Sequence, residues 1–255
     1  MKKKGFIFDI DGVIADTPHE AAWRESLNFL FTQRGDWEQI KHKTNYSAEN
    51  FTTDLYRKEI SGKPRIEGAR STLAYFHVPD PNENFLNEYC NFKQKIFLEK
   101  IEQGEFKVYD DAILFVLLEA KQKGGKLVAA SSSKNANPIL ERINMFEFTK
   151  RNNLKFDFID EGTSLLKLFD GNVCGIDVGK GKPDPGIFLK AAESIGLLPD
   201  ECIVIEDAVN GVQAAKAGNF FCIGIARLNN EDELENANAD IVTNDLKKIF
   251  KEIFQ

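Results

Sequence analysis

Apolar and polar positions follow two different patterns along the chain, and the change falls near residue 105. A short apolar run that begins at Gly5 predicts a buried strand, but residues 16 to about 104 contain no convincing strand pattern. Instead, apolar side chains recur there at the spacing of one helix face, which is typical of a helix-bundle core. The two stripes are Trp23, Leu27, Leu30 and Phe31, and Phe85, Leu86, Tyr89, Phe92, Ile96 and Phe97.

From about residue 105 onward, short apolar runs alternate with helical patterns. The expected strands are Lys126–Ala130, Asn172–Cys174, Cys202–Ile205, Phe220–Ile225 and Asp240–Thr243. The expected helices are Asp110–Lys123, one after Asn135, one opened by Pro185, Val212–Lys216 and Leu246–Phe254. Strands separated by helices predict an α/β fold, with a doubly wound, Rossmann-like parallel sheet that has helices on both faces.

The two patterns together predict two domains. We expect residues 1–15 and 105–255 to form an α/β core domain. We expect residues 16–104 to form an all-helical domain inserted after the first strand.

Composition and charge exclude several classes of partner. The 255 residues carry a net charge of −7 with no basic stripe, which argues against a nucleic-acid partner. No apolar run approaches the length of a membrane span, and the start of the chain does not resemble a signal peptide, so we expect a cytoplasmic protein. The four cysteines have no CxxC spacing, which favours structural thiols. A monomer and a small homo-oligomer both remain open.

Polar side chains follow several of the predicted strands at the point where each strand ends. In a parallel sheet, ligands bind at the carboxyl ends of the strands, at the point where the strand order reverses. These polar side chains, together with a lysine just before a predicted helix, are therefore expected to share one cleft. They are Asp9 and Asp11, Ser131–Asn135, Lys182, and Glu206 and Asp207.

Four carboxylates and one lysine in one cleft indicate a particular chemistry. Close like charges repel one another, and a divalent cation relieves that repulsion; oxygen ligands with a substrate phosphate suit Mg²⁺. Asp9 can then attack phosphorus, while Lys182 and the metal neutralise the anion. Alternation along an extended strand puts Asp9 and Asp11 on one face, so Asp11 can exchange the proton. Gly12 allows the chain to turn sharply.

Four segments in this order resemble the haloacid dehalogenase superfamily: "DIDGV", "ASSSKN", "GKPDPGIF" and "VIEDAVNGVQAAKAG". The helical insert after the first segment is similar to the cap of the β-phosphoglucomutase-like subfamily. The resemblance implies an aspartyl-phosphate mechanism on a small sugar phosphate, with Mg²⁺ as the cofactor. It also implies the following roles: Asp9 as nucleophile, Asp11 as acid and base, Ser131 and Lys182 as phosphate ligands, and Asp9, the main-chain carbonyl of Asp11, Asp207 and Glu206 around the metal.

Finer similarities point toward the mutases of this subfamily. "SSSKN" is similar to a mutase segment that contacts a bound sugar phosphate, here through Ser133, Lys134 and Asn135. "SGKPR" resembles a specificity loop of the cap, with Gly62, Lys63 and Arg65 at the matching positions, and His19 resembles a hinge histidine. The stretch from about Phe146 to Gly181 is longer than in these mutases, and is either a surface elaboration or a change in access to the cleft.

Several alternatives remain at this point. A mutase would return the phosphoryl group to a second oxygen of the sugar, a phosphatase would transfer it to water, and a non-catalytic binding module would use the fold alone. The serines and Glu206-Asp207 also fit helix caps, and Arg65 fits a solvated surface charge.

Overall fold

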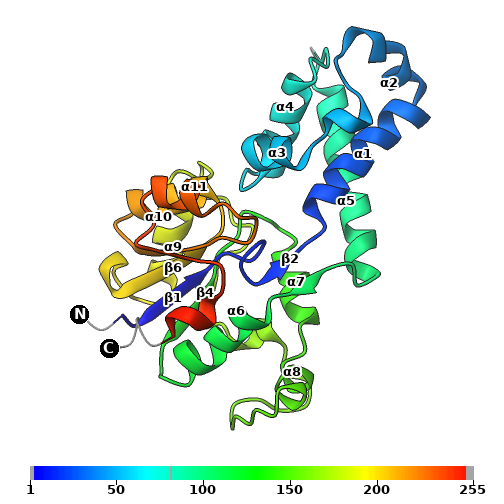
Figure 1. Ribbon diagram of the computed structural model, residues 1–255. Helices are drawn as coiled ribbons and strands as arrows, with labels where there is room; N and C mark the ends of the chain where they lie inside the picture. Colours follow the sequence, from blue (N-terminus) through cyan, green and yellow to red (C-terminus); the bar gives the residue numbers. More distant parts are fainter. Residues whose placement is uncertain (1–2, 81, 251–255) are drawn as a thin grey trace. The chain divides into compact units, whose positions relative to one another are not determined.

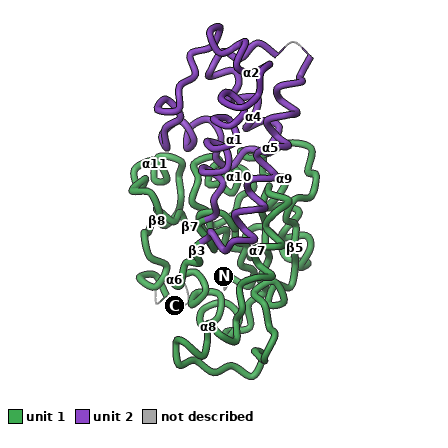
Figure 2. Tube along the Cα trace, turned by 90° about the vertical axis from the view of Figure 1, so that its right-hand side faces the viewer, with its two compact units in different colours: residues 1–16, 107–255 green, residues 17–106 purple. Residues whose placement is uncertain are grey.

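The computed structural model describes residues 3–80 and 82–250 (Figure 1). The chain divides into two compact units (Figure 2). Unit 1 contains residues 1–16 and 107–255, and unit 2 contains residues 17–106. Each unit has its own apolar core.

Unit 1 is built on a six-stranded parallel sheet with the strand order β5-β4-β1-β6-β7-β8. The chain runs outward from the central strand β1 through β4 to β5, and then returns to the other side of β1 to form β6. The strand order therefore reverses at β1, where the carboxyl ends of β1, β4 and β6 lie together. The strands are β1 Gly5–Phe8, β4 Lys126–Ala129, β5 Gly171–Asn172, β6 Cys202–Glu206, β7 Phe221–Ile225 and β8 Ile241–Thr243.

Helices cover both faces of this sheet. Alternate side chains of β1 point to opposite faces, so each of the two layers of helices packs on a different set of them. Ile7 packs with α9, α10 and α11, whereas the rings of Phe6 and Phe8 meet Phe115 at centroid distances of 5.9 and 6.1 Å. Figure 1 shows α9 to α11 on one side and α6 on the other. The helices of unit 1 are α6 Asp110–Leu114, α7 Ala136–Arg142, α8 Met145–Arg151, α9 Gly186–Ser194, α10 Val209–Ala217 and α11 Glu231–Asn236, with short 3₁₀ turns at Leu165–Leu168, Pro199–Glu201 and Leu246–Ile249. The expected doubly wound α/β fold is confirmed.

The bounds of some elements differ from the sequence-based expectation. The long helix expected from Asp110 is α6 followed by a π-helical turn, Phe115–Lys121. A two-residue antiparallel pair, β2 Ala15–Asp16 with β3 Lys107–Val108, was not anticipated, since such short strands have no period to read. The closing helix is a 3₁₀ turn as far as Ile249, and the remainder of that expectation, at 251–254, lies outside the described residues.

Unit 2 is helical, and its core is aromatic. The first predicted stripe is fully buried on α1, and on α5 the buried positions include Leu86, Tyr89 and Phe97, while Phe92 and Ile96 are half-buried. Within the two described stretches, 3–80 and 82–250, no helix is both long and apolar enough to cross a bilayer. The helices are α1 His19–Gln33, α2 Gly35–Ile40, α3 Thr53–Leu55, α4 Arg65–Tyr75 and α5 Asn84–Glu102, with short turns at Lys41–Lys43, Ala48–Asn50 and Tyr56–Ile60.

The long 146–181 stretch adds most of α8 and a 3₁₀ turn between α7 and β5. Its base is closed by a hydrogen bond from the Met145 N–H to the Thr163 carbonyl, 2.9 Å long. In both views α8 lies at the end of unit 1 away from α10 and α11 (Figure 1, Figure 2).

Candidate active site

A buried lysine lies between two buried carboxylates at the reversal point of the sheet. The Lys182 ammonium donates to Asp9 Oδ1 at 2.7 Å and also to Glu206 Oε1. The side chains of Lys182 and Glu206 are only 2% and 1% exposed, and that of Asp9 is 10% exposed. Because ionised groups remain buried only when they are paired, these three side chains form one electrostatic unit. Asp9 follows β1, Glu206 ends β6, and Lys182 comes from the loop before α9.

Main-chain groups and a glycine hold Glu206 in place. Its second oxygen, Oε2, accepts the N–H groups of Asp207 and Ala208 at 2.7 and 2.8 Å. Gly211, on the first turns of α10, leaves room for the carboxylate: a Cβ at this position would lie 1.8 Å from Glu206 Oε1. Gly211 was not predicted as a site residue, although a glycine inside a helical pattern is the signal that the sequence offers.

Asp207 adds a further acid beside the turn that follows Asp9. Its carboxyl is turned inward against Gly12, where a Cβ would lie 2.0 Å from Asp207 Oδ2. Gly12 has a φ of +80°, which glycine adopts without strain. Asp11 lies in this turn and not in the strand, so the alternation argument for Asp9 and Asp11 ends at the strand. Burial, and then the charges of Glu206, Asp9 and Asp11, raise the pKa of Asp207 well above its ordinary value.

Burial is the first cause of the raised pKa of both Asp9 and Asp207. Burial raises the pKa of Asp9 to about 6, with Lys182 acting in the opposite direction and Glu206 in the same one. Burial alone would lower the pKa of Lys182, but Asp9 and Glu206 outweigh it, and the pKa is raised. Lys182 therefore stays charged, while burial opposes the ionisation of Asp9 and Asp207.

The segment 131–135 forms a tight loop after β4. Ser131 Oγ accepts the N–H of Ser133 at 3.1 Å, and Ser133 Oγ accepts the N–H of Asn135 at 3.2 Å. The cap position of α7 is Asn135, so the interpretation of the serines as caps of that helix is wrong. Ser131 and Asn135 are buried, and Lys134 is exposed. Burial and the charge of Asp9 raise the pKa of Cys174 to about 12, and this thiol also faces the Ser131 main chain, so the serine loop lies close to Asp9.

The residues at this edge of the sheet offer oxygen donors to a metal. In the described part of the chain, no group of three Asp, Glu, His or Cys side chains is arranged as a ready metal site. However, a hard cation with retained waters does not require three side chains, because main-chain carbonyls and carboxylates through water also serve. Asp9, Glu206 and Asp207 bring three carboxyl groups to a site with one buried ammonium, Lys182, and burial raises the pKa of Asp9 and Asp207, so the donor set fits a divalent cation such as Mg²⁺.

The cap residues singled out in the sequence all lie in unit 2. Gly62 has a φ of +74°, in the turn before α4. The Lys63 ammonium donates to Ser71 Oγ at 3.0 Å, so it already has a partner within the unit. Arg65 is half-buried and is the first residue of α4.

His19 has a partner that sequence reasoning missed. The Lys93 ammonium lies 2.7 Å from His19 Nδ1 and over the rings of Trp23 and Phe97, at 5.1 and 4.6 Å from their centroids. Burial, and then the charges of Lys93 and Arg65, hold the pKa of His19 well below its usual range. The imidazole is therefore neutral and accepts at Nδ1. The missed signal was a lysine four residues from both Tyr89 and Phe97, within an apolar stripe.

The fold and the site together define an α/β enzyme whose acidic side chains gather at the carboxyl ends of parallel strands. The model of the haloacid dehalogenase-like hydrolase family matches residues 3–219. The chain belongs to this family, and the protein is an enzyme of it.

Curated relatives and solved structures refine the comparison. The chain is 29% identical to a beta-phosphoglucomutase of Mycobacterium bovis, over 97% of this chain and 92% of the relative. It is 30% identical to a phosphorylated carbohydrates phosphatase of Thermotoga maritima, over 84% and 81%. The crystal structure of a beta-phosphoglucomutase from Pyrococcus sp. strain ST 04 is 30% identical, with a TM-score of 0.65 over 96% of this chain and 93% of that one. The expected similarity to the β-phosphoglucomutase-like subfamily is confirmed.

Gly211→Ala tests the packing around Glu206. Alanine normally stabilises a helix interior by about 1 kcal/mol relative to glycine. Here the new Cβ must displace the Glu206 carboxylate, so we expect a destabilisation of about 1–3 kcal/mol, as in overpacked cores. Thermal and urea unfolding measure the difference. Gly35→Ala is the control, because a Cβ at Gly35 meets nothing within 4 Å. A stabilised Gly211→Ala protein would contradict the account.

Proposed function

We propose that the protein transfers a phosphoryl group on a small sugar phosphate through a covalent aspartyl phosphate at Asp9, as a β-phosphoglucomutase-like enzyme. The observation that supports this most strongly is the buried cluster of Asp9, Lys182 and Glu206, with Asp207 beside it. A buried carboxylate that is held by a lysine at the carboxyl end of a strand is suited to nucleophilic attack on an anion. Relatives named for mutase and for phosphatase activity fit the same chemistry.

In the proposed reaction, a carboxylate oxygen of Asp9 attacks phosphorus and forms the new P–O bond. The bond from phosphorus to the ester oxygen breaks, and that oxygen takes a proton from Asp11. In the second step Asp11 takes the proton back from the attacking hydroxyl, which displaces Asp9 from phosphorus. Lys182 and Ser131 bind the transferred phosphoryl group, and Ser133, Lys134 and Asn135 contact the rest of the sugar phosphate. In unit 2, Gly62, Lys63 and Arg65 form the proposed specificity loop.

Asp9, the main-chain carbonyl of Asp11, and Asp207 would hold Mg²⁺, with Glu206 as a direct ligand or through a water molecule. When bound, the ion neutralises the negative charge of the phosphoryl group and of the acids around it. Lys182 already pairs with Glu206, which leaves Asp207 as the acid that most needs the cation.

The final acceptor distinguishes a mutase from a phosphatase. A mutase excludes water and returns the phosphoryl group to a sugar hydroxyl, whereas a phosphatase admits water to the same intermediate. The test is incubation with β-glucose 1-phosphate, a trace of the 1,6-bisphosphate and Mg²⁺, followed by product analysis. Glucose 6-phosphate is the expected product; free phosphate alone would identify a phosphatase. The absence of both products, with no hydrolysis of simple esters, would leave only the non-catalytic alternative.

The two acids of the first motif should fail in different ways. Asp9→Asn removes the nucleophile and abolishes turnover, because an amide does not attack phosphorus. Asp11→Asn keeps the main-chain carbonyl but removes the proton carrier, so we expect a loss in rate on the order of 10²–10⁴ with phosphate binding largely kept. Rapid-quench kinetics and phosphate titration measure the two effects. Substantial Mg²⁺-dependent turnover by Asp9→Asn would contradict the assignment.

Magnesium should stabilise the protein more strongly as pH rises. The pKa of Asp207 is raised in the folded state, so its protonated form favours folding, and this contribution disappears as pH rises through the folded-state pKa. A cation that replaces the proton restores the lost stability. The Tm increase caused by MgCl₂ should therefore be larger at mildly alkaline than at mildly acidic pH.

Asp207→Asn should remove most of that pH dependence. Asp200→Asn, an exposed acid just before β6 at the opposite end of the same strand, should keep it. An equal effect of Mg²⁺ on Asp207→Asn and on the unmodified protein would exclude Asp207 as a ligand.

Arg65 tests the proposed specificity loop. A guanidinium binds a phosphate with two parallel hydrogen bonds, which lysine cannot reproduce. Arg65→Lys should therefore reduce kcat/KM for the sugar bisphosphate on the order of tenfold while hydrolysis of p-nitrophenyl phosphate is unchanged. Arg70→Lys on the same helix, whose side chain is exposed and pairs with Glu83, is the control. Equal losses on both substrates would rule out a specificity role.

A further inference from the structure

Arg227 forms a buried ion pair that the proposed reaction does not use. It lies two residues beyond the end of β7, and its guanidinium donates to both oxygens of Asp111, at 3.0 Å each. The two side chains are only 9% and 10% exposed, so the pair is largely protected from solvent. The guanidinium also lies 3.9 Å from the ring centroid of Tyr109. Such a planar, bidentate arrangement fixes the orientation of the arginine.

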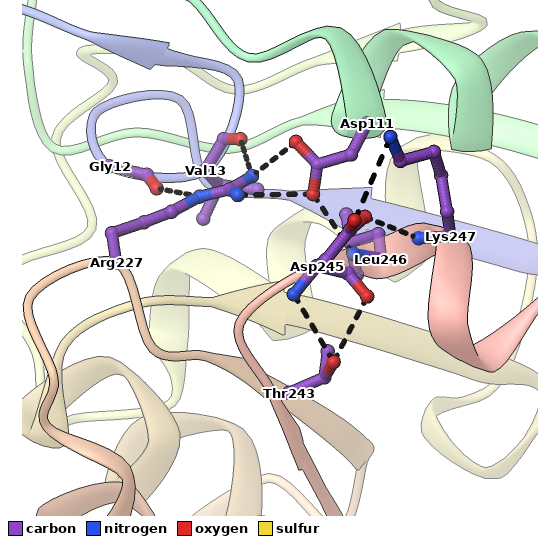
Figure 3. Close-up of polar contacts among 8 residues, drawn as sticks. All are labelled: Gly12, Val13, Asp111, Arg227, Thr243, Asp245, Leu246 and Lys247. Carbon is purple, nitrogen blue, oxygen red and sulfur yellow. Dashed lines mark hydrogen bonds and ion pairs between the residues drawn. The ribbon is translucent and has the colours of Figure 1, made fainter.

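The same guanidinium reaches the turn that carries Asp11 (Figure 3). Arg227 Nε donates to the Gly12 carbonyl and Nη2 to the Val13 carbonyl, both at 3.4 Å. Four of the five N–H donors of the arginine are thus directed at Asp111 and the turn. Arg227 is therefore occupied as an internal brace and is not free to bind a substrate phosphate.

Asp111 is itself anchored from a third part of unit 1. Its Oδ2 accepts the N–H of Leu246 at 2.9 Å, just after β8. The turn before Leu246 is held by a hydrogen bond from the Asp245 N–H to Thr243 Oγ1 (Figure 3). The carboxylate that orients Arg227 therefore cannot rotate freely.

Main-chain hydrogen bonds shape the turn between β1 and β2, and Arg227 adds side-chain donors to two of its carbonyls. The Gly12 N–H donates to the Ala15 carbonyl at 2.8 Å, and the N–H groups of Ile14 and Ala15 donate to the Ile10 carbonyl at 2.9 and 3.0 Å. The Asp207 carboxyl packs against Gly12. Without Arg227, the carbonyls of Gly12 and Val13 would lose their guanidinium donors, and Asp111 would lose its cation. The two peptides that follow Asp11 would then be held by the main-chain hydrogen bonds of the turn alone.

We propose that Arg227, oriented by Asp111, is a positioning residue that fixes the Asp11–Ile14 turn and thereby places the Asp11 carboxyl for proton transfer. This inference rests on the proposed function, in which Asp11 protonates the leaving oxygen. A displacement of about 1 Å in such a group can cost on the order of 10²-fold in rate.

The test compares two esters of similar shape, phenyl phosphate and p-nitrophenyl phosphate, in the presence of Mg²⁺. Phenolate is the more basic leaving group and needs the proton more, so a misplaced acid slows phenyl phosphate selectively. Arg227→Lys keeps the positive charge but loses the planar guanidinium that donates to both oxygens of Asp111. We expect its kcat/KM, which reports the step that forms the aspartyl phosphate, to fall on the order of 10- to 10²-fold for phenyl phosphate and by less for p-nitrophenyl phosphate. Merely structural damage would lower both rates in the same proportion.

Two controls separate positioning from stability. Asp170→Asn removes an acid that, like Asp111, accepts a main-chain N–H (from Leu127, at 2.8 Å) and pairs with a cation, Lys121. It should lower Tm and leave the ratio of the two rates unchanged. Arg151→Lys changes the exposed arginine that pairs with Asp110, the neighbour of Asp111, and should alter neither quantity.

A double-variant cycle gives the decisive result. In an Asp11→Asn background, Arg227→Lys should not change the ratio further, because the group that it positions is absent. Hydrogen exchange should also quicken selectively at the amides of Gly12, Ile14 and Ala15 in Arg227→Lys. An unchanged ratio in the single variant, or an equal change in the Asp11→Asn background, would overturn the inference. If the unmodified protein hydrolyses neither ester and makes no glucose 6-phosphate, the proposed function fails instead, and this inference fails with it.

Discussion

The buried contacts of Lys182 with Asp9 and Glu206 are the constraint on which the rest of the site depends. Three charged groups with side chains at most 10% exposed require close pairing, because removal of one partner leaves an uncompensated charge in a medium of low dielectric. That requirement connects the end of β1, the end of β6 and the loop before α9. Two glycines leave the space that these acids occupy. A Cβ at Gly211 would overlap the carboxylate of Glu206, and a Cβ at Gly12 would overlap that of Asp207.

The same cluster supports the proposed phosphoryl transfer. One lysine does not balance the three carboxyl groups of Asp9, Glu206 and Asp207, and burial raises the pKa of Asp9 and Asp207. In the proposed function, a divalent cation would offset the negative charge of the three acids, and Lys182 would bind the anionic phosphate ester.

Much of the fold was predictable because apolar residues recur at regular spacing and acidic residues follow the apolar strands directly. The apolar runs of β4, β6 and β7 and the buried stripe of α1 follow from spacing alone, and Asp9, Glu206 and Asp207 interrupt strands in a way that few structural roles explain. The partner of His19 was missed because it depends on Lys93, seventy-four positions away. The ion pair of Arg227 and Asp111 was missed for the same reason: both residues look like ordinary surface charges in sequence, and only tertiary packing buries them. The two-residue strands β2 and β3 are too short to have a pattern.

The central claim is that Asp9 becomes covalently phosphorylated, and acid-quenched mass spectrometry tests it most directly. The protein is mixed with Mg²⁺ and a phosphate ester, quenched in acid within one turnover, digested and mapped. The account predicts one added phosphoryl group on the peptide that contains Asp9, labile to hydroxylamine as an acyl phosphate is. Continued turnover with no phosphoryl group on that peptide, or with the group on another residue, would contradict it.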